Sequence, residues 1–204
     1  MFFTGCPVFS LEKPILTPYL PDSLKDKQKS GKWVGELKLK SKRSIISTDH
    51  TGKASVYLYN TKKPVVIKGD ALNRLQDLPP KSLFDCSILE HNSLTRLWIF
   101  DCLMFEGQLL DIEMIQRKRL LSNIATDDLI WIPIHSDFWL RELELIKNWN
   151  SGLVKETALK CGIPYCDFRE IVTGMVIKNK HSFLSYPEKT KFVASSMFKI
   201  NLMS

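Results

Sequence analysis

The chain has 204 residues, of which 44% are hydrophobic and 25% are charged, which suits one compact domain or one domain with a small lobe. Its 29 lysines and arginines outnumber its 22 aspartates and glutamates, so the formal net charge is +7 and the pI is about 9.1. No apolar run is long enough to cross a bilayer, so no membrane partner is expected. The positive charge permits binding to nucleic acid or another polyanion but does not require it.

Cysteine usage favours a reducing, intracellular compartment. The five cysteines form no Cys-x-x-Cys pair, and no histidine lies at ligand spacing from any of them, so neither a disulfide framework nor a zinc site is expected. Cys86 and Cys102 lie in apolar runs and are predicted to be buried thiols. The first six residues lack the basic and apolar parts of a signal peptide. For a viral protein, the compartment would be the host cytoplasm.

The chain divides into an arm at residues 1–32 and a domain at residues 33–204. Four prolines interrupt the arm, which predicts an extended segment with at most one short turn of helix; they are Pro7, Pro14, Pro18 and Pro21. The arm could lie across the domain or dock on a protein partner, and both alternatives stay open.

The first half of the domain has a β pattern. Alternating residues predict strands at residues 33–39, 43–47 and 54–59, and a further strand at residues 65–67. Apolar residues at helical spacing follow from Ala71 to Leu78, where Pro79 and Pro80 end the helix.

The second half mixes strands and helices. Residues 83–89 and 97–105 predict two adjacent antiparallel strands, which are apolar on both faces as central strands are. A basic amphipathic helix is expected at residues 111–124, and a helix capped by Ser136 is expected to present an apolar face from Trp139 to Trp149. The remaining predictions are strands at residues 129–134, 169–178 and 192–200 and a short helix at residues 154–160. This order predicts an α+β fold of two packed, mainly antiparallel sheets with flanking helices and a cleft.

Five stretches carry the side chains of functional interest. In chain order they are Glu36–Arg43, Leu83–Leu89, Leu97–Leu103, Val172–Lys178 and Phe198–Ile200. Alone, the first stretch could be an edge strand whose lysines face water and prevent aggregation.

Together, these stretches resemble the nucleotidyltransferase domain of ATP-dependent DNA ligases, especially the small phage-type enzymes. The resemblance runs from about Trp33 to about Asn201. RNA ligases and mRNA capping enzymes share the fold, which is ATP-grasp-like and holds the nucleotide in the cleft between its sheets. The resemblance implies ATP with magnesium as the cofactor set, and DNA or RNA as the partner.

Several basic and aromatic positions of the family motifs are kept. Lys38 stands where the family has the lysine that attacks the α-phosphate of ATP and becomes lysyl-AMP. Arg43 closes the same motif, and Phe100 matches the aromatic that stacks on adenine, although core packing would also explain it. Lys178 and Lys199 match basic positions of the last two motifs. The resemblance therefore implies Lys38 as the nucleophile and the other four as nucleotide-binding residues.

The acidic positions of the motifs are lost. Lys40 replaces the aspartate of the first motif, Ser87 replaces the glutamate that meets the ribose, and Thr173 replaces the glutamate that organises the metal. Glu90 and Glu170 each lie three residues from a lost glutamate, which in a regular strand is the opposite face. Magnesium needs oxygen ligands, usually with a carboxylate among them, so no metal-binding residue is predicted.

Two further family positions also differ. Asn60 stands where an arginine is expected after the third strand, and Asn201 replaces the second lysine of the last motif. The chain ends where the family appends an OB-fold, so strand sealing is not expected.

The preferred hypothesis is a catalytically impaired ligase-like domain, a pseudoenzyme that serves as a module for binding nucleotide or nucleic-acid phosphate, or as a structural interaction module. The alternative is an active ATP-dependent adenylyltransferase that forms lysyl-AMP on Lys38. In the first case ATP and magnesium are not required, and a protein partner stays open.

Overall fold

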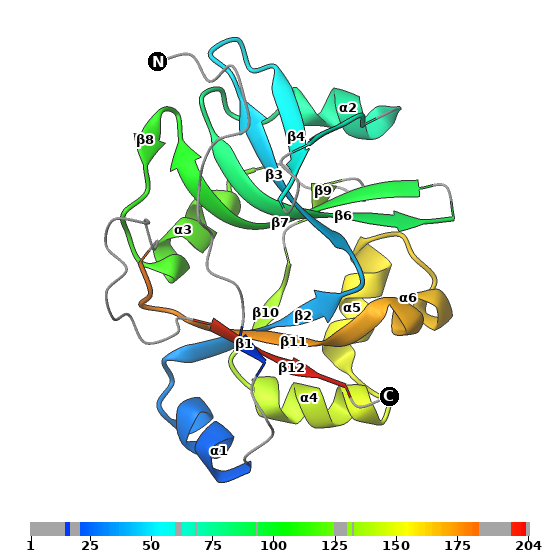
Figure 1. The fold of residues 1–204 in the computed structure, drawn as a ribbon. Coiled ribbons are helices and arrows are strands. Elements are labelled where there is room, and N and C mark those ends of the chain that lie inside the picture. The colour runs from blue at the N-terminus through cyan, green and yellow to red at the C-terminus, as the bar shows by residue number, and fades with distance from the viewer. Residues whose placement is uncertain are drawn as a thin grey trace. The chain divides into compact units, whose positions relative to one another are not determined.

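The structure is a computed structural model that describes residues 15–16, 21–59, 63–67, 69–92, 94–124, 130–131, 133–183 and 197–202. Backbone contacts divide the chain into two compact units, one built from residues 41–132 and the other from residues 10–40 and 133–204 (Figure 1). Each unit contains one sheet. The predicted α+β class with two mainly antiparallel sheets and flanking helices is confirmed.

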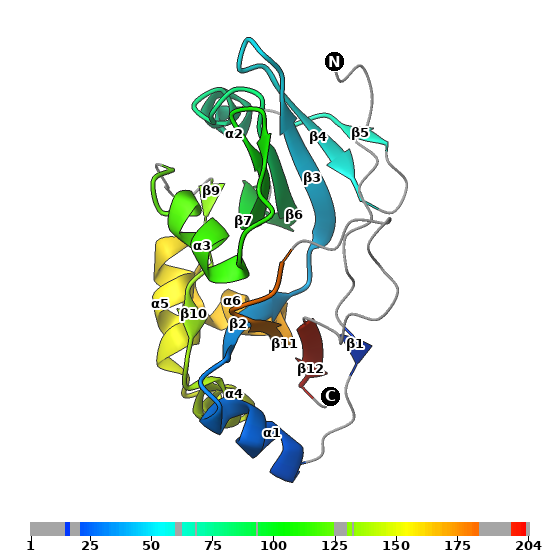
Figure 2. The same cartoon turned by 90° about the vertical axis from the view of Figure 1, so that its left-hand side faces the viewer.

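The first unit has a sheet of seven strands among its described residues, in the order β5-β4-β3-β6-β7-β8, with β9 parallel to β7. Figure 2 shows β3, β4 and β5 side by side. The strands are β3 (Lys42–Thr48), β4 (Ala54–Leu58), β5 (Pro64–Val65), β6 (Leu83–His91), β7 (Leu94–Phe105), β8 (Gln108–Leu109) and β9 (Ile130–Trp131).

One face of this sheet forms the core of the first unit. Helices α2 (Asp70–Leu75) and α3 (Met114–Leu121) contribute Ala71, Leu75 and Leu121 to it. The predicted thiols Cys86 and Cys102 lie in this core and are fully buried, as expected. Burial raises the pKa of the Cys102 thiol to about 12, so it stays protonated and behaves as a small apolar side chain.

Helix α3 forms within the segment predicted to be a basic amphipathic helix, but two of its basic side chains lie inside the protein. Arg117 and Lys118 are both buried, at 3% and 7% exposure. Arg117 is held there by Asp101 in the neighbouring strand β7, whose carboxylate accepts two hydrogen bonds of 2.8 Å from the Arg117 guanidinium. The helix is also shorter than residues 111–124, and it begins after a capping box formed by Glu113 and Gln116.

The second unit has a sheet of five strands among its described residues, in the order β1-β12-β11-β2-β10. All neighbours are antiparallel except β1 and β12. The strands are β1 (Ile15–Leu16), β2 (Trp33–Leu39), β10 (His135–Ser136), β11 (Val172–Asn179) and β12 (Met197–Asn201), and the helices are α1 (Pro21–Lys29), α4 (Trp139–Lys147), α5 (Gly152–Lys160) and α6 (Tyr165–Ile171).

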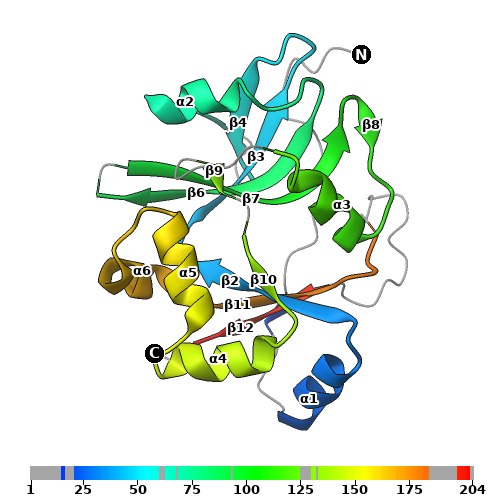
Figure 3. The ribbon, with the colours of Figure 1, turned by 180° about the vertical axis from the view of Figure 1, so that it is seen from behind.

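Helix α4 packs against one face of this five-stranded sheet (Figure 3). Its buried side chains are Trp139, Leu143 and Ile146. Gly35 in β2 makes the contact possible, since a Cβ atom there would lie 2.4 Å from Cβ of Trp139. The sheet approaches the helix closely because this position has no side chain.

Three sequence predictions for the second unit are wrong in detail. Ser136 belongs to β10, and its hydroxyl accepts the Phe138 N–H at 3.1 Å instead of capping α4. Trp149 lies beyond the end of α4, and Gly152 begins α5, where Ser151 is the N-cap and accepts the Val154 N–H. Residues 165–171 form helix α6, so only the part from Val172 onwards is a strand.

The prediction of an extended arm with one short turn of helix is wrong for residues 21–29, which form the nine-residue helix α1. Pro21 occupies its first turn, where the missing N–H costs nothing. Leu24 is 1% exposed, and the Gln28 side chain accepts the Leu140 N–H of α4 at 2.7 Å. Residues 1–14 and 17–20 of the arm lie outside the described residues.

Candidate functional site

Three of the predicted site residues share one face of the five-stranded sheet. Residues directly opposite each other in antiparallel strands point to the same face. Lys38 is opposite Gly174, while Glu36 and Lys199 are both opposite Val176. Lys178 follows Val176 by two residues in β11, so its side chain points to the same face of the sheet. We call the surface that carries Glu36, Lys38, Lys178 and Lys199 the lysine face; the other face packs on α4.

The Lys38 amine is held by Thr173. Its Nζ donates to the Thr173 hydroxyl at 2.9 Å, and that hydroxyl donates to the Lys38 carbonyl oxygen at 3.1 Å. Burial, and next the charge of Lys199, lower the pKa of Lys38 below its ordinary value of 10.5. A neutral hydroxyl therefore contacts the amine at the position where the family has a carboxylate.

Local backbone geometry explains why Thr173 can reach Lys38. The pairing of β11 with β2 shifts register between Val172 and Gly174, so Thr173 is the extra residue of a bulge. Gly174 follows with φ of 150°, and a Cβ atom there would lie 2.0 Å from the Ile200 carbonyl oxygen. The glycine kept from the family motif is required by this close approach of β12.

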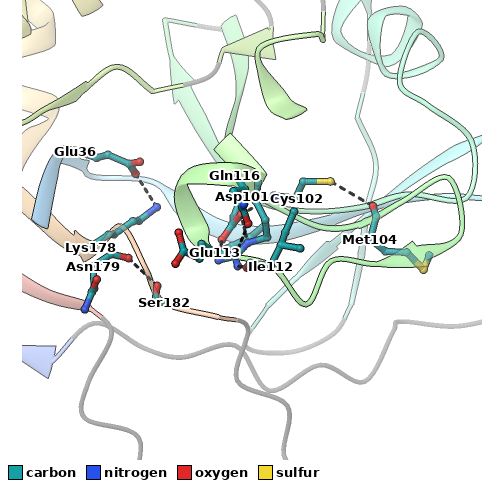
Figure 4. Close-up of polar contacts among 12 residues, drawn as sticks. Glu36, Asp101, Cys102, Met104, Ile112, Glu113, Gln116, Lys178, Asn179 and Ser182 are labelled. Atoms are coloured by element: carbon teal, nitrogen blue, oxygen red, sulfur yellow. Dashed lines mark hydrogen bonds and ion pairs between the residues drawn. The ribbon is translucent and has the colours of Figure 1, made fainter. Parts of the chain in front are cut away.

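The other two lysines of the face differ in their surroundings. Lys178 is 7% exposed and forms a 2.7 Å ion pair with Glu36, which is 1% exposed (Figure 4). Lys199 is half-buried and has no carboxylate partner among the described residues. Lys38 and Lys199 are thus two neighbouring cations without a described counter-ion, while the charge of Lys178 is already balanced.

The remaining predicted residues, Arg43 and Phe100, belong to the first unit. The Arg43 guanidinium donates two hydrogen bonds to Asp85, of 3.0 and 2.7 Å, and lies over the Tyr59 ring at 5.0 Å. Burial acts to lower the pKa of Arg43, but the Asp85 carboxylate outweighs it and the pKa is raised. Arg43 is therefore a fixed cation with its charge largely balanced.

Phe100 lies at a bulge in β7. Cys86 is opposite Ile99 and Asp85 is opposite Asp101, so Phe100 is an extra residue between them. Its chain neighbour Ile99 lies in the core cluster, and the bulge takes Phe100 out of the regular alternation of faces. Its ring is half-buried and is not part of the core cluster. Packing in that core therefore does not explain Phe100.

The positions of the lost carboxylates hold no replacement. Lys40 is exposed, and Ser87 is buried opposite Arg43 and Trp98. Glu90 forms an exposed ion pair with Lys42 at 2.6 Å. Within the residues that the structure describes, no group of three histidine, cysteine, aspartate or glutamate side chains could hold a metal ion. The described residues therefore offer no preformed cluster of metal ligands. Asn60 lies outside the described residues.

The expectation that Glu170 lies on the opposite face of a strand from Thr173 is wrong. Glu170 lies on helix α6, not on a strand, so the alternation of faces does not apply to it. Its side chain is exposed and lines the same pocket as Thr173.

Sequence reasoning missed the buried or largely buried carboxylates that hold the basic residues in place. Glu36 neutralises Lys178, Asp85 holds Arg43, and Asp101 holds Arg117. A signal was present in the sequence, because both aspartates follow a phenylalanine within an apolar strand. A carboxylate in such a place needs a cationic partner.

No protein-family model matches this sequence, and no curated protein matches it. Solved structures do match. The ligase domain of LigD from M. tuberculosis superposes with a TM-score of 0.57 at 16% identity, over 94% of this chain and 59% of that one. A structure called Pmar-Lig_Pre superposes with a TM-score of 0.61 at 15% identity, over 96% of this chain and 47% of that one. The ATP-dependent DNA ligase of bacteriophage T7, solved with ATP, superposes with a TM-score of 0.50 at 10% identity, over 93% of this chain and 67% of that one.

These likenesses establish the fold. The chain has the nucleotidyltransferase-domain fold of ATP-dependent DNA ligases, as the motif order predicted. It spans 59% of the length of the LigD ligase domain and 47% of Pmar-Lig_Pre. Among the described residues, none of the helices combines the length and the hydrophobicity needed to span a lipid bilayer.

Proposed function

We propose that this domain binds nucleotide or nucleic-acid phosphate and that its adenylyl-transfer chemistry is impaired. The observation that carries the proposal is the pair Lys38 and Lys199 on the lysine face. The charge of Lys199 acts on Lys38, and a hydroxyl, not a carboxylate, contacts the Lys38 amine. Two partly buried cations without a described counter-ion attract a phosphate.

The nucleotide fits this set of residues better than the metal does. Lys38 and Lys199 would hold phosphate oxygens, and we propose Arg43 and Phe100 of the first unit as further nucleotide-binding residues. ATP bound to the T7 ligase of the same fold supports this assignment. The described residues offer no carboxylate cluster, so the proposal contains no step through a metal ion.

The Lys38 amine itself is partly prepared for attack. A lysine must lose its proton before it can act as a nucleophile, and the lowered pKa makes that easier. The departing pyrophosphate, however, needs its charge stabilised, and Ser87 and Thr173 are neutral where the family has glutamates. Each 1.4 kcal/mol of lost transition-state stabilisation slows the step by about tenfold, so a missing metal site outweighs a modest gain in nucleophilicity.

A second candidate function is active adenylyl transfer. The lowered pKa of Lys38 favours it, since a structural lysine on a polar surface needs no such shift. In that case the domain would form lysyl-AMP on Lys38 despite the substituted positions. DNA, RNA and a protein partner all remain compatible with either function.

The test separates binding from chemistry. We expect ATP labelled at the α-phosphate to bind the wild-type chain without covalent incorporation, with magnesium or manganese present. Lys199→Gln should weaken binding by about tenfold, the loss of one charge-assisted contact, while the exposed control Lys53→Gln should not. Unchanged binding in Lys199→Gln would refute the proposed site.

The covalent result decides between the two functions. Label incorporated by the wild type and lost in Lys38→Ala would establish the active enzyme. If the wild type stays unlabelled, the triple change Lys40→Asp, Ser87→Glu and Thr173→Glu asks whether the carboxylates were the missing part. Restored labelling would support the impaired-site account.

A further inference from the structure

The hydrogen bonds of Thr173 fix the direction of its contact with the Lys38 amine. A hydroxyl has one proton, and Thr173 donates that proton to the Lys38 carbonyl oxygen at 3.1 Å. Its oxygen can therefore only accept from Lys38 Nζ, which lies 2.9 Å away. A neutral amine that donates an N–H in this way keeps its nitrogen lone pair for another atom.

The other two lysines of the lysine face differ in what their charges can do. Lys178 is 7% exposed, and its charge is balanced by Glu36 at 2.7 Å (Figure 4). Lys199 is half-buried, and in the described part of the chain no carboxylate pairs with it. Burial, and next the charge of Lys199, lower the pKa of Lys38, which raises the neutral fraction of that amine. Lys199 is thus a cation for an anionic group beside an amine with an available lone pair.

We propose that Lys38 is a site of acylation by acyl phosphates, the mixed anhydrides of a carboxylic acid and phosphoric acid. Lys199 binds the phosphate of the donor, and the Lys38 nitrogen attacks its carbonyl carbon. A nitrogen–carbon bond forms, and the bond from the carbonyl carbon to the phosphate oxygen breaks. Inorganic phosphate leaves with that electron pair and takes up the proton that the amine loses. The inference rests on the phosphate contact of Lys199 proposed above, but it requires no nucleotide.

Acylation of Lys38 changes the lysine face. An amide nitrogen carries no charge and is no longer a nucleophile, so one of the two cations is lost. We expect acetylation at Lys38 to weaken ATP binding by about tenfold, the loss of one charge-assisted contact. The same modification would prevent the formation of lysyl-AMP.

The experiment compares two reagents that deliver the same acetyl group. Acetyl phosphate carries a phosphate, whereas acetic anhydride is uncharged. For each reagent, mass spectrometry of the wild-type chain gives the acetylation rate of Lys38 relative to that of the exposed Lys53. We expect this ratio to be about tenfold greater with acetyl phosphate, the gain from one charge-assisted contact. We call that difference the phosphate-dependent preference; equal ratios for the two reagents would overturn the proposal.

Variants of Lys199 identify the group that binds the phosphate. Lys199→Gln should abolish the phosphate-dependent preference, while Lys199→Arg, which keeps a cation, should retain it. Lys29→Gln removes an exposed charge of α1 outside the lysine face and should leave the preference unchanged. An equal loss in Lys29→Gln and Lys199→Gln would assign the effect to the overall charge of the chain and refute the site.

ATP binding by the same preparations separates this proposal from the function proposed above. A chain that binds ATP through Lys199 but shows no phosphate-dependent preference would refute acylation and leave the nucleotide function standing. A phosphate-dependent preference in a chain that does not bind ATP would support acylation and refute the nucleotide function.

Acetyl-CoA tests the class of the acyl donor, because it carries the acetyl group as a thioester. We expect it to acetylate Lys38 relative to Lys53 with a lower preference than acetyl phosphate does. A higher preference with acetyl-CoA would make a thioester the donor and overturn the assignment to acyl phosphates.

Discussion

Aspartates with little exposure to solvent hold basic side chains of the first unit. Asp101 accepts two hydrogen bonds from Arg117 and one of 2.9 Å from the Cys102 N–H, and the Arg117 side chain is only 3% exposed. Removing one partner of a buried ion pair leaves an uncompensated charge. The exposed pair Lys42–Glu90, at 61% and 56% side-chain exposure, lies in water and has little effect on stability.

We predict that Asp101→Asn lowers the free energy of unfolding by about 3 kcal/mol, because Arg117 stays buried without its counter-ion. Glu90→Gln, the matched change at the exposed pair, should cost less than about 1 kcal/mol. Urea denaturation of both variants measures the difference. Equal losses would mean that Arg117 finds another partner or moves into water.

The titration of Lys38 depends on Lys199. Burial and this neighbouring cation lower the pKa of Lys38 below 10.5. We predict that Lys199→Gln raises the pKa of Lys38, because a neutral side chain no longer opposes protonation. NMR titration of ¹³C-methylated lysines reports the change, and Lys29→Gln on α1 is the control. A Lys38 pKa that is identical in the wild type and Lys199→Gln would contradict the arrangement of the lysine face.

At the scale of elements, the contact between β2 and α4 depends on Gly35. A Cβ atom there would lie 2.4 Å from Trp139 and 2.7 Å from the Met175 methyl group. We predict that Gly35→Ala destabilises the chain by about 1–3 kcal/mol, because overpacking displaces the buried helix. Gly152→Ala in α5 meets nothing within 4 Å and should be neutral or stabilising. Thermal denaturation of the two variants compares them; similar transition temperatures would mean that α4 moves without cost.

Strands with one buried and one polar face were predictable from the sequence. Residues 33–39 alternate, and the strand is found at those residues. A strand was predicted from residue 169, because Ile171 and Val172 are adjacent apolar residues across the end of α6. Phe168 and Ile171, three residues apart, are both buried, which is a helical spacing.

Two strand bulges limit how much of the candidate site could be predicted from the sequence. The regular alternation of side chains between the two faces of a strand does not hold at Phe100 and Thr173, because each is an extra residue in its strand. The resemblance predicted Lys38 and Lys199 at one nucleotide site, and the pairing of β2 and β12 with β11 places both on the lysine face. Glu36 as the partner of Lys178 could not be predicted, because it depends on the register of β2 against β11.

At the scale of the whole molecule, a net charge of +7 attracts any polyanion, so binding alone does not identify a site. The dependence of affinity on salt separates general attraction from local contacts. Each phosphate that a lysine neutralises on single-stranded nucleic acid releases counter-ions and contributes about 0.7 to the slope of log K against log salt.

We predict that single-stranded DNA or RNA binds the wild-type chain with an affinity that falls steeply as salt rises. Lys38→Gln combined with Lys199→Gln should reduce the slope by about 1.4, because two phosphate contacts are lost. The control combines Lys29→Gln with Lys53→Gln, two exposed lysines outside the lysine face, and changes the net charge by the same amount. Fluorescence anisotropy at several salt concentrations measures both slopes. Equal slopes for the two double variants would show that the overall charge, and not the lysine face, binds the phosphates.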